Sequence, residues 1–224
     1  MTAIVLQARL DSSRLPGKAL LLLDNKPLVF RVMEALNHIQ SDFKILACTE
    51  DSFSSFAPLA KEAGFEIFAG PKDDVLARFC QVIKKFSIDR VIRATGDNPF
   101  VFADAADALS KEAVSLNADY SGFMELPYGA GVESVLSSAL MRAFNEAALP
   151  SEREHVCPYL YNHPEIFKLH RPCALSKWRY PQMRVTVDTQ EDYDRAVELY
   201  AALKDERFRY NGETIINAYN RIFK

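Results

Sequence analysis

The chain has 224 residues, of which 49% are hydrophobic and 25% are charged, and this composition is typical of one globular domain with a substantial core. Its formal net charge is −3, whereas a general nucleic-acid binder usually carries a basic excess, so any anion-binding site must be local. The first apolar run is too short for a signal peptide and no stretch approaches a membrane span. We therefore expect a cytoplasmic protein that binds neither nucleic acid nor a membrane.

Cysteines are few and scattered, with no C-x-x-C pair. They are Cys48, Cys80, Cys157 and Cys173. We expect reduced thiols in the core of a cytosolic protein, not a metal site or a disulfide framework.

The first half of the chain alternates short apolar runs with helical patterns, which favours an α/β fold with a mostly parallel sheet covered by helices. The expected elements are, in order, a strand at 3–7, a helix at 27–36, a strand at 44–49, a helix at 56–63, a strand at 65–68, a helix at 73–86 and a strand at 89–95. Pro27 suits the start of a helix, Gly64 suits the end of one, and Asp73 or Asp74 provides an N-terminal cap.

The second half begins with another helix and then loses its regular pattern. The expected elements are a helix at 103–113, an irregular segment at 117–136, helices at 137–148 and 152–162, a strand at 184–187, a helix at 190–203 and a last helix after Gly212. The irregular segment is rich in tyrosine and glycine, so we expect a substrate lip there. No internal repeat or linker is visible, and residues 1–224 are expected to form a single domain.

The loop at residues 7–18 follows the first strand and gathers three cations, Arg9, Arg14 and Lys18. Together with the backbone N–H groups of a turn, these cations would bind a polyphosphate. Arginine offers a planar fork to phosphate oxygens, while lysine offers a mobile point charge. On residue types alone, solvated surface charges are an equally good explanation.

Two aspartates, Asp97 and Asp188, each follow an expected strand. Side chains at the carboxyl ends of parallel strands meet at one edge of a sheet, and Mg²⁺ prefers carboxylate and phosphate oxygens. The pair beside the cationic loop therefore predicts a magnesium site. Taken singly, Asp97 also suits a turn and Asp188 also suits a helix cap.

Two charged segments have a structural explanation as well as a functional one. Ser151 and Glu154 have the spacing of a helix capping box, and Asp74 and Arg78 have the spacing of an ion pair within a helix. No P-loop, G-x-G-x-x-G, G-x-S-x-G or H-E-x-x-H motif occurs. Covalent catalysis thus has no candidate nucleophile, and positioning with electrostatic stabilisation is the expected mechanism.

Five motifs in series resemble one family. They are Gln7-Ala8-Arg9 with Ser12 and Arg14-Leu15-Pro16-Gly17-Lys18; Gly70 with Asp73-Asp74-Val75-Leu76 and Arg78; Thr95-Gly96-Asp97 with Pro99; Arg153-Glu154-His155-Val156 with Pro158-Tyr159; and Thr186-Val187-Asp188-Thr189 with Glu191-Asp192. This series resembles the cytidylyltransferases of the spore coat polysaccharide biosynthesis type, relatives of the acylneuraminate and 3-deoxy-manno-octulosonate cytidylyltransferases.

The resemblance implies a mixed, mostly parallel sheet flanked by helices, as in the nucleotide-diphospho-sugar transferase fold, which is GT-A-like and Rossmann-like. It also implies transfer of CMP from CTP to a sugar acid with release of pyrophosphate, a need for Mg²⁺, and a homodimer in which the irregular segment at 117–136 is a candidate contact. The implied catalytic residues are Arg14, Lys18 and Asp97, and the implied metal ligands are Asp97 and Asp188. The implied nucleotide-binding residues are Gln7, Ala8, Arg9, Ser12, Arg14, Lys18, Thr49, Asp74, Arg78 and Gly96. The implied acceptor-binding residues are Asn98, Tyr128, Glu133, Arg153, Glu154 and His155.

The chain departs from the family pattern at two positions. Gly131 stands where many relatives have an acid two residues before Glu133, and Asp11 stands where glycine is common. Two other functions remain open: a GT-A-like glycosyltransferase that uses a metal with Asp97 to bind a nucleotide sugar, and a nucleotide-binding module without catalysis. The cationic segment from Arg14 to Lys18 argues against the first, because a triphosphate requires it more than a sugar diphosphate does.

Overall fold

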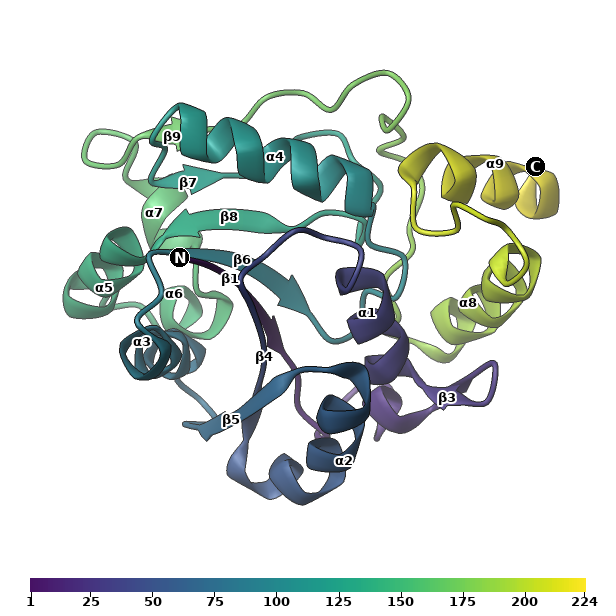
Figure 1. Cartoon of the computed structure of the whole chain (residues 1–224), viewed down its shortest axis with the longest axis horizontal. Helices are drawn as coiled ribbons and strands as arrows, with labels where there is room; N and C mark the ends of the chain where they lie inside the picture. Colours follow the sequence, from purple (N-terminus) through teal and green to yellow (C-terminus); the bar gives the residue numbers. More distant parts are fainter.

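Seven strands form one mixed sheet in the order β5-β4-β1-β6-β8-β7-β9, in a computed structural model that describes residues 1–224 (Figure 1). Their bounds are β1 Thr2–Gln7, β4 Phe43–Thr49, β5 Glu66–Gly70, β6 Arg90–Thr95, β7 Tyr120–Ser121, β8 Glu133–Leu136 and β9 Leu169–His170. β1 pairs in parallel with β4 and β6, and β4 pairs in parallel with β5. β8 is antiparallel to β6 and β7, and β9 is parallel to β7. The expected mixed, mostly parallel sheet is confirmed.

Helices cover both faces of the sheet, since the strands at its centre are apolar on both sides. Their bounds are α1 Leu28–Leu36, α2 Phe53–Ala63, α3 Val75–Phe86, α4 Ala103–Ser115, α5 Ser137–Glu146, α6 Pro150–His155, α7 Pro158–Asn162, α8 Gln190–Leu203 and α9 Gly212–Phe223. In β1, Ile4 and Leu6 face α1, α2 and α4, while Ala3 and Val5 face α3, α5 and α7. This alternation follows from the two-residue repeat of a strand.

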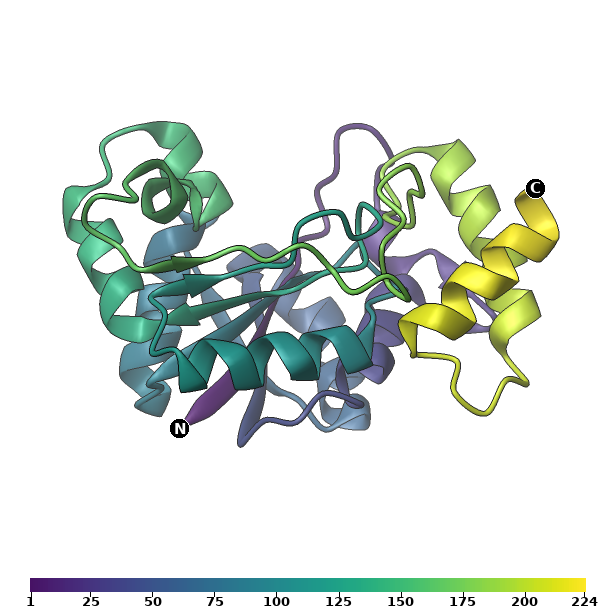
Figure 2. The same ribbon diagram turned by 90° about the horizontal axis from the view of Figure 1, so that it is seen from above.

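A third hydrophobic cluster holds α8 and α9 against the end of the sheet, where Trp178 and Phe102 are buried. Figure 1 shows these two helices at the far right, beyond α1. Seen from above, in Figure 2, the loop that follows β1 rises between the group formed by α5, α6 and α7 and the helix α8. A small hairpin, β2 Leu22–Leu23 with β3 Lys26–Pro27, lies just before α1. None of the helices combines the length and the apolar composition needed to cross a membrane.

The structure corrects several expected elements. Residues 184–187 are not a strand: they form an extended segment with one isolated bridge, between Arg184 and Tyr128. The segment has the alternating polar and apolar sequence of a strand, but Thr186 is buried as well as Val185 and Val187, and the segment lies along loops. Its backbone contacts run from Val185 N to Tyr128 O and from Val187 N to Asp97 O, both 2.9 Å.

The segment expected to be irregular, 117–136, contains β7 and β8, which pair with each other and extend the sheet. The helix expected at 152–162 divides into α6 and α7, and α5 ends at Glu146. The division lies at Val156, whose φ of 73° and ψ of −54° form a tight turn closed by a 2.9 Å hydrogen bond from Cys157 N to His155 O. Cys173 is exposed, whereas the other three cysteines are buried as expected.

Candidate functional site

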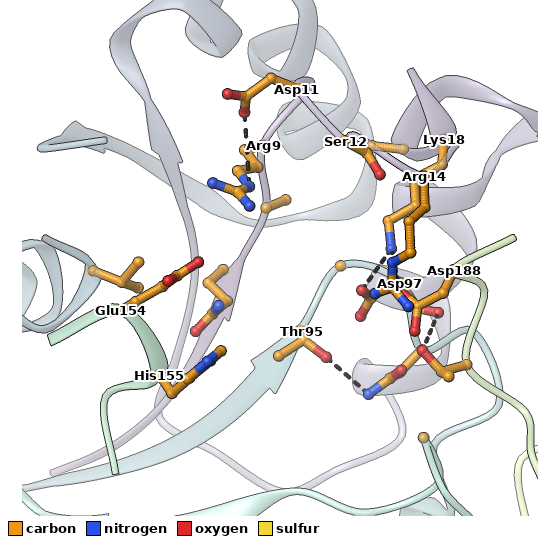
Figure 3. A pocket seen from close by; sticks show the side chains of 18 of the residues that line it. Arg9, Asp11, Ser12, Arg14, Lys18, Thr95, Asp97, Glu154, His155 and Asp188 are labelled. Carbon is orange, nitrogen blue, oxygen red and sulfur yellow. Dashed lines mark hydrogen bonds and ion pairs between the residues drawn. The ribbon is translucent and has the colours of Figure 1, made fainter. Parts of the chain in front are cut away.

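A cavity of about 500 Å³, called the first cavity below, opens at the carboxyl ends of β1 and β6 (Figure 3). In a parallel sheet, this edge is the usual place for a ligand, because the loops that leave the strands are free to shape it. Figure 3 shows Glu154 and His155 on one side and Lys18, Arg14, Asp97 and Asp188 on the other, with Thr95 between them. The remaining lining residues are Gln7, Ala8, Arg9, Asp11, Ser12, Ser13, Ala19, Val75, Arg78, Arg93, Gly96, Asn98, Tyr128, Gly129 and Thr186.

The loop between β1 and the short helix at Lys18–Leu20 forms one wall of the first cavity. Leu10 N donates a 3.1 Å hydrogen bond to Ser52 Oγ, which anchors the loop to the next strand–helix junction. Gly17, with φ of 68°, precedes the short helix in the left-handed region that glycine tolerates best. The loop therefore presents Arg9, Arg14 and Lys18 from one anchored segment.

Lys18 joins the two aspartates at one end of the first cavity. Its Nζ donates hydrogen bonds to Asp97 Oδ2 at 2.8 Å, to Asp188 Oδ1 at 2.9 Å and to the Val187 carbonyl at 2.8 Å. All three ammonium protons thus have an oxygen partner. The structure brings together the residues predicted to hold a metal, with a protein cation between them.

Asp188 is surrounded by further positive charge. Arg14 Nη2 lies 3.0 Å from its Oδ1, and Arg184 Nη2 donates a 2.7 Å hydrogen bond to its Oδ2. Burial alone would raise the pKa of Asp188, but the hydrogen bond and charge of Lys18, followed by the charges of Arg14 and Arg184, outweigh burial and hold the pKa below its ordinary value. Asp188 therefore stays ionised near neutral pH.

Close backbone packing places both aspartates. Gly96 N donates a 2.8 Å hydrogen bond to Gln7 O, and a Cβ at Gly96 would come within 2.8 Å of Ala8 Cβ. Gly129 has φ of 95°, and a Cβ there would come within 2.5 Å of Thr186 N. These two contacts hold the end of β6 against β1 and the extended segment against the 128–131 loop.

Arg78, on α3, contributes an unusual charge to the first cavity. Arg78 is only 2% exposed, and its Nε and Nη1 have no hydrogen-bond partner within the chain. Burial lowers its pKa. A buried guanidinium normally has partners, so these free donors favour a polar or anionic ligand that completes the site.

Four residues assigned to substrates by the resemblance do not line the first cavity. Asp74 caps α3 through a 2.8 Å hydrogen bond from Ala77 N, and it accepts a 2.8 Å hydrogen bond from Arg153 Nε. The ion pair expected between Asp74 and Arg78 is therefore wrong, because Arg153 takes that carboxylate. Thr49 is buried and its Oγ1 lies 2.7 Å from Ser52 Oγ, behind the loop. The fourth residue, Glu133, lines a neighbouring cavity.

Glu154 and His155 do line the first cavity, at the end of α6. The capping box expected for Ser151 and Glu154 is wrong. Because α6 begins at Pro150, the side chain that accepts from the start of the helix is Glu152, at 3.3 Å from Leu149 N.

Sequence reasoning missed Ser13 and Arg93 as residues of the first cavity, and it assigned no binding role to Thr95 and Thr186 although both stand in the quoted motifs. Arg93 had a detectable signal, since a charge within a buried strand needs a partner. The place of Thr186 in the cavity could not be predicted, because it depends on the path of the extended segment.

The chemistry of the donor set fits a hard divalent cation. Two carboxylates and a backbone carbonyl converge on one positive group, and oxygen ligands of this kind suit Mg²⁺. No cluster of three or more His, Cys, Asp or Glu side chains occurs. Water and phosphate oxygens would complete the coordination.

A mostly parallel sheet with a cation-rich cavity at the carboxyl ends of its strands defines an α/β protein with a candidate site for an anionic ligand. The family model described as cytidylyltransferase matches residues 3–215, and the chain belongs to this family. It is 32% identical to the spore coat polysaccharide biosynthesis protein SpsF of Bacillus subtilis, over 97% of this chain and 93% of that protein.

Two further comparisons also find proteins named as cytidylyltransferases. The 3-deoxy-manno-octulosonate cytidylyltransferase of Psychrobacter cryohalolentis is 31% identical over 69% of this chain and 63% of that enzyme. A solved cytidylyltransferase from Leptospira borgpetersenii superposes with a TM-score of 0.88 at 24% identity, over 98% of this chain and 94% of that one. The fold and the enzyme class expected from the sequence are confirmed.

Proposed function

We propose that the chain transfers CMP from CTP to a sugar acid and releases pyrophosphate, as an activation step in surface polysaccharide or glycoconjugate biosynthesis. One observation carries this proposal: Lys18 and Arg14 meet the acid pair Asp97 and Asp188 at one end of the first cavity. A triphosphate with a divalent cation matches that arrangement of cations and carboxylates. The names of the relatives from B. subtilis and P. cryohalolentis support the polysaccharide role and the sugar-acid acceptor.

The residues of the first cavity divide into two groups in this proposal. The nucleotide contacts are Gln7, Ala8, Arg9, Ser12, Arg78 and Gly96. Arg14 and Lys18 stabilise the charge on the departing pyrophosphate as the acceptor oxygen attacks the α-phosphorus in line. Mg²⁺ held by Asp97 and Asp188 would neutralise part of the phosphate charge. No general base is assigned.

Arg78 adds a second line of support. Its unpartnered Nε and Nη1 would gain acceptors from a nucleotide, either from carbonyl or ring atoms of the base or from phosphate oxygens. On the acceptor side we propose Asn98 and Tyr128, with Glu154 and His155 at the opposite wall. Arg153 and Asp74 would act indirectly, because their side chains bind each other. A homodimer stays a prediction from the resemblance.

The test measures pyrophosphate release with each of the four ribonucleoside triphosphates against a panel of sugar acids, in the presence of Mg²⁺. Of the four nucleotides, we expect only CTP to give pyrophosphate release, and only when an acceptor is present. Asp97→Asn should lower the rate by about 100-fold, since it removes a ligand charge. A matched control is Asp205→Asn, because Asp205 is exposed and forms no ion pair. A normal rate for Asp97→Asn at saturating Mg²⁺ would show that the metal assignment is wrong.

The same assay separates the alternatives. A glycosyltransferase would consume a nucleotide sugar and release no pyrophosphate. A module without catalysis would bind CTP in calorimetry but release nothing with any acceptor.

A further inference from the structure

A second cavity, of about 520 Å³, adjoins the first and is bordered by β6, β7, β8 and the loop at 122–131. Five residues line both cavities: Arg93, Thr95, Asn98, Tyr128 and Gly129. They mark the junction through which a group bound in one cavity would reach a group bound in the other. Asn98 donates a 2.8 Å hydrogen bond to Thr95 Oγ1, while its buried Oδ1 has no partner within the chain.

Arg93 is the only charged residue of this junction, and it is held from two sides. Its Nε donates a 3.1 Å hydrogen bond to Gln7 Oε1, and its Nη1 donates to Glu133 Oε2. Tyr120 OH donates a 2.8 Å hydrogen bond to the other oxygen of Glu133. Although burial disfavours its charge, the neighbouring Glu133 raises the pKa of Arg93, so the guanidinium stays protonated.

The Nη2 of Arg93 forms no hydrogen bond within the chain, and it is not among the polar atoms cut off from solvent. It is therefore a donor that a bound molecule can reach. Each oxygen of Glu133 accepts one hydrogen bond, from Arg93 or from Tyr120, so Glu133 orients the arginine. The other acid of the second cavity, Glu125, is paired with Arg179 at 3.1 Å.

The reaction geometry limits where an anionic group of the acceptor can lie. The attacking oxygen must reach the α-phosphorus of a nucleotide bound in the first cavity, so it lies at the junction. If the acceptor carries a carboxylate on the carbon that bears the attacking hydroxyl, only two bonds separate that oxygen from the carboxyl carbon. The carboxylate then also lies at the junction, beside Arg93.

On this basis, and resting on the proposed function, we propose that the second cavity receives the acceptor and that Arg93 binds the acceptor's carboxylate. A guanidinium fork suits a planar carboxylate, and Arg93 is held in place before the substrate arrives. Glu133 and Tyr120 are positioning residues. Arg171 lines the second cavity only and is exposed, so it lies away from the reacting oxygen.

The test compares 3-deoxy-manno-octulosonate and N-acetylneuraminate with their C1 carboxamides and with neutral sugars, by pyrophosphate release with CTP and Mg²⁺. For an acid that the chain uses, the wild type should prefer the acid to its carboxamide by about 100-fold in kcat/KM, as a buried charged contact would provide. Arg93→Met should remove most of this preference, because it should lower the activity toward the acid but not the activity toward the carboxamide. Glu133→Gln should raise the acceptor KM with a smaller change in kcat.

The matched control is Arg90→Met. Arg90 is a buried arginine of the same strand that lines neither cavity and donates to Ala118 O at 2.9 Å. The Arg90→Met protein should keep the preference for the acid over its carboxamide, even if its stability falls. Arg93→Lys, which keeps the charge, should retain part of the preference and covers the case in which Arg93→Met does not fold. Calorimetry with CTP reports nucleotide binding in every variant.

The outcomes separate this inference from the proposed function. If Arg93→Met and Arg93→Lys keep the full preference, or if Arg171→Met removes it, the assignment of Arg93 is wrong although nucleotidyl transfer stands. Use of neutral sugars and not of acids would also overturn the inference alone. No pyrophosphate release with any acid or neutral sugar, in a protein that binds CTP, would overturn the proposed function and the inference with it.

Discussion

Lys18 donates a 2.8 Å hydrogen bond to Asp97, and the same ammonium group lies 2.9 Å from Asp188. A cation of the loop after β1 thus occupies the space between two acids that arrive from distant parts of the chain. In the proposed reaction that space suits a divalent cation, while Lys18 is needed at the phosphates. Metal binding and the position of Lys18 should therefore be coupled.

Removing the ammonium group should strengthen metal binding and weaken catalysis. In Lys18→Met, the two carboxylates lose their protein cation, so we expect the nucleotide-free chain to bind Mn²⁺ about tenfold more tightly, a change of about 1.4 kcal/mol. Turnover should fall by about 100-fold, because the leaving pyrophosphate loses a positive partner. Electron paramagnetic resonance measures free Mn²⁺ directly. Lys84→Met, at an exposed lysine of α3, is the control, and equal Mn²⁺ affinity in the wild type and Lys18→Met would refute the coupling.

Arg78→Met should have opposite effects on stability and on binding. The wild-type guanidinium is buried with two unpartnered nitrogens, so replacing it with an apolar side chain should raise the free energy of unfolding by about 1 kcal/mol. CTP affinity should fall by about tenfold, since a charged hydrogen bond to the ligand is lost. Urea unfolding with and without CTP measures both quantities.

Arg90→Met provides the contrast for that experiment. Arg90 is also buried, but its guanidinium donates to Ala118 O at 2.9 Å, so its removal leaves a carbonyl without a donor and should destabilise the chain. If Arg78→Met and Arg90→Met lose stability equally, the Arg78 guanidinium does not destabilise the ligand-free chain, and the assignment of its free donors to a ligand is wrong.

Gly129→Ala should disturb the acid pair from a distance. A Cβ at Gly129 would come within 2.5 Å of Thr186 N, two residues before Asp188, at a φ of 95°. We expect a loss of about 2–4 kcal/mol in the free energy of unfolding and a higher Mg²⁺ requirement for activity. Gly64→Ala is the matched control: Gly64 has φ of 76° but open space around its Cβ position, so it should cost only about 1 kcal/mol. Similar losses at both positions would mean that the contact with Thr186 is unimportant.

Acid should remove the stabilisation that Asp188 provides. The pKa of Asp188 is lower in the folded chain than its ordinary value of 3.8, so its contribution is fully present above about pH 4 and is lost as the pH falls through the folded pKa. The difference in unfolding free energy between the wild type and Asp188→Asn should thus stay constant near neutral pH and shrink below about pH 4. Urea titrations from pH 7 to pH 3 would measure it. A difference that grows in acid would show that the surrounding cations do not stabilise the carboxylate.

Much of the fold followed from local patterns. A short apolar run predicted the first strand as buried, and its side chains are buried on both faces, with Ile4 and Leu6 on one side and Ala3 and Val5 on the other. The same pattern misled at Val185 and Val187, because a buried extended segment and a strand share one periodicity and differ only in their partners. The tight turn at Val156 was also hidden, since no local signal marks a positive φ at a β-branched residue.

The sequence by itself determined the cations of the loop and the family, because charge and motif order are properties of local segments and their order. It also predicted that Asp97 and Asp188 meet, but from a strand before Asp188 that the structure does not contain. Only the tertiary structure decided which charges are partners. In the structure Asp74 is paired with Arg153, Lys18 lies between the two aspartates, and Arg93 lies at the junction of two cavities. Each of these contacts joins residues far apart in the chain, and their spacing depends on how helices and loops pack, which no local pattern records.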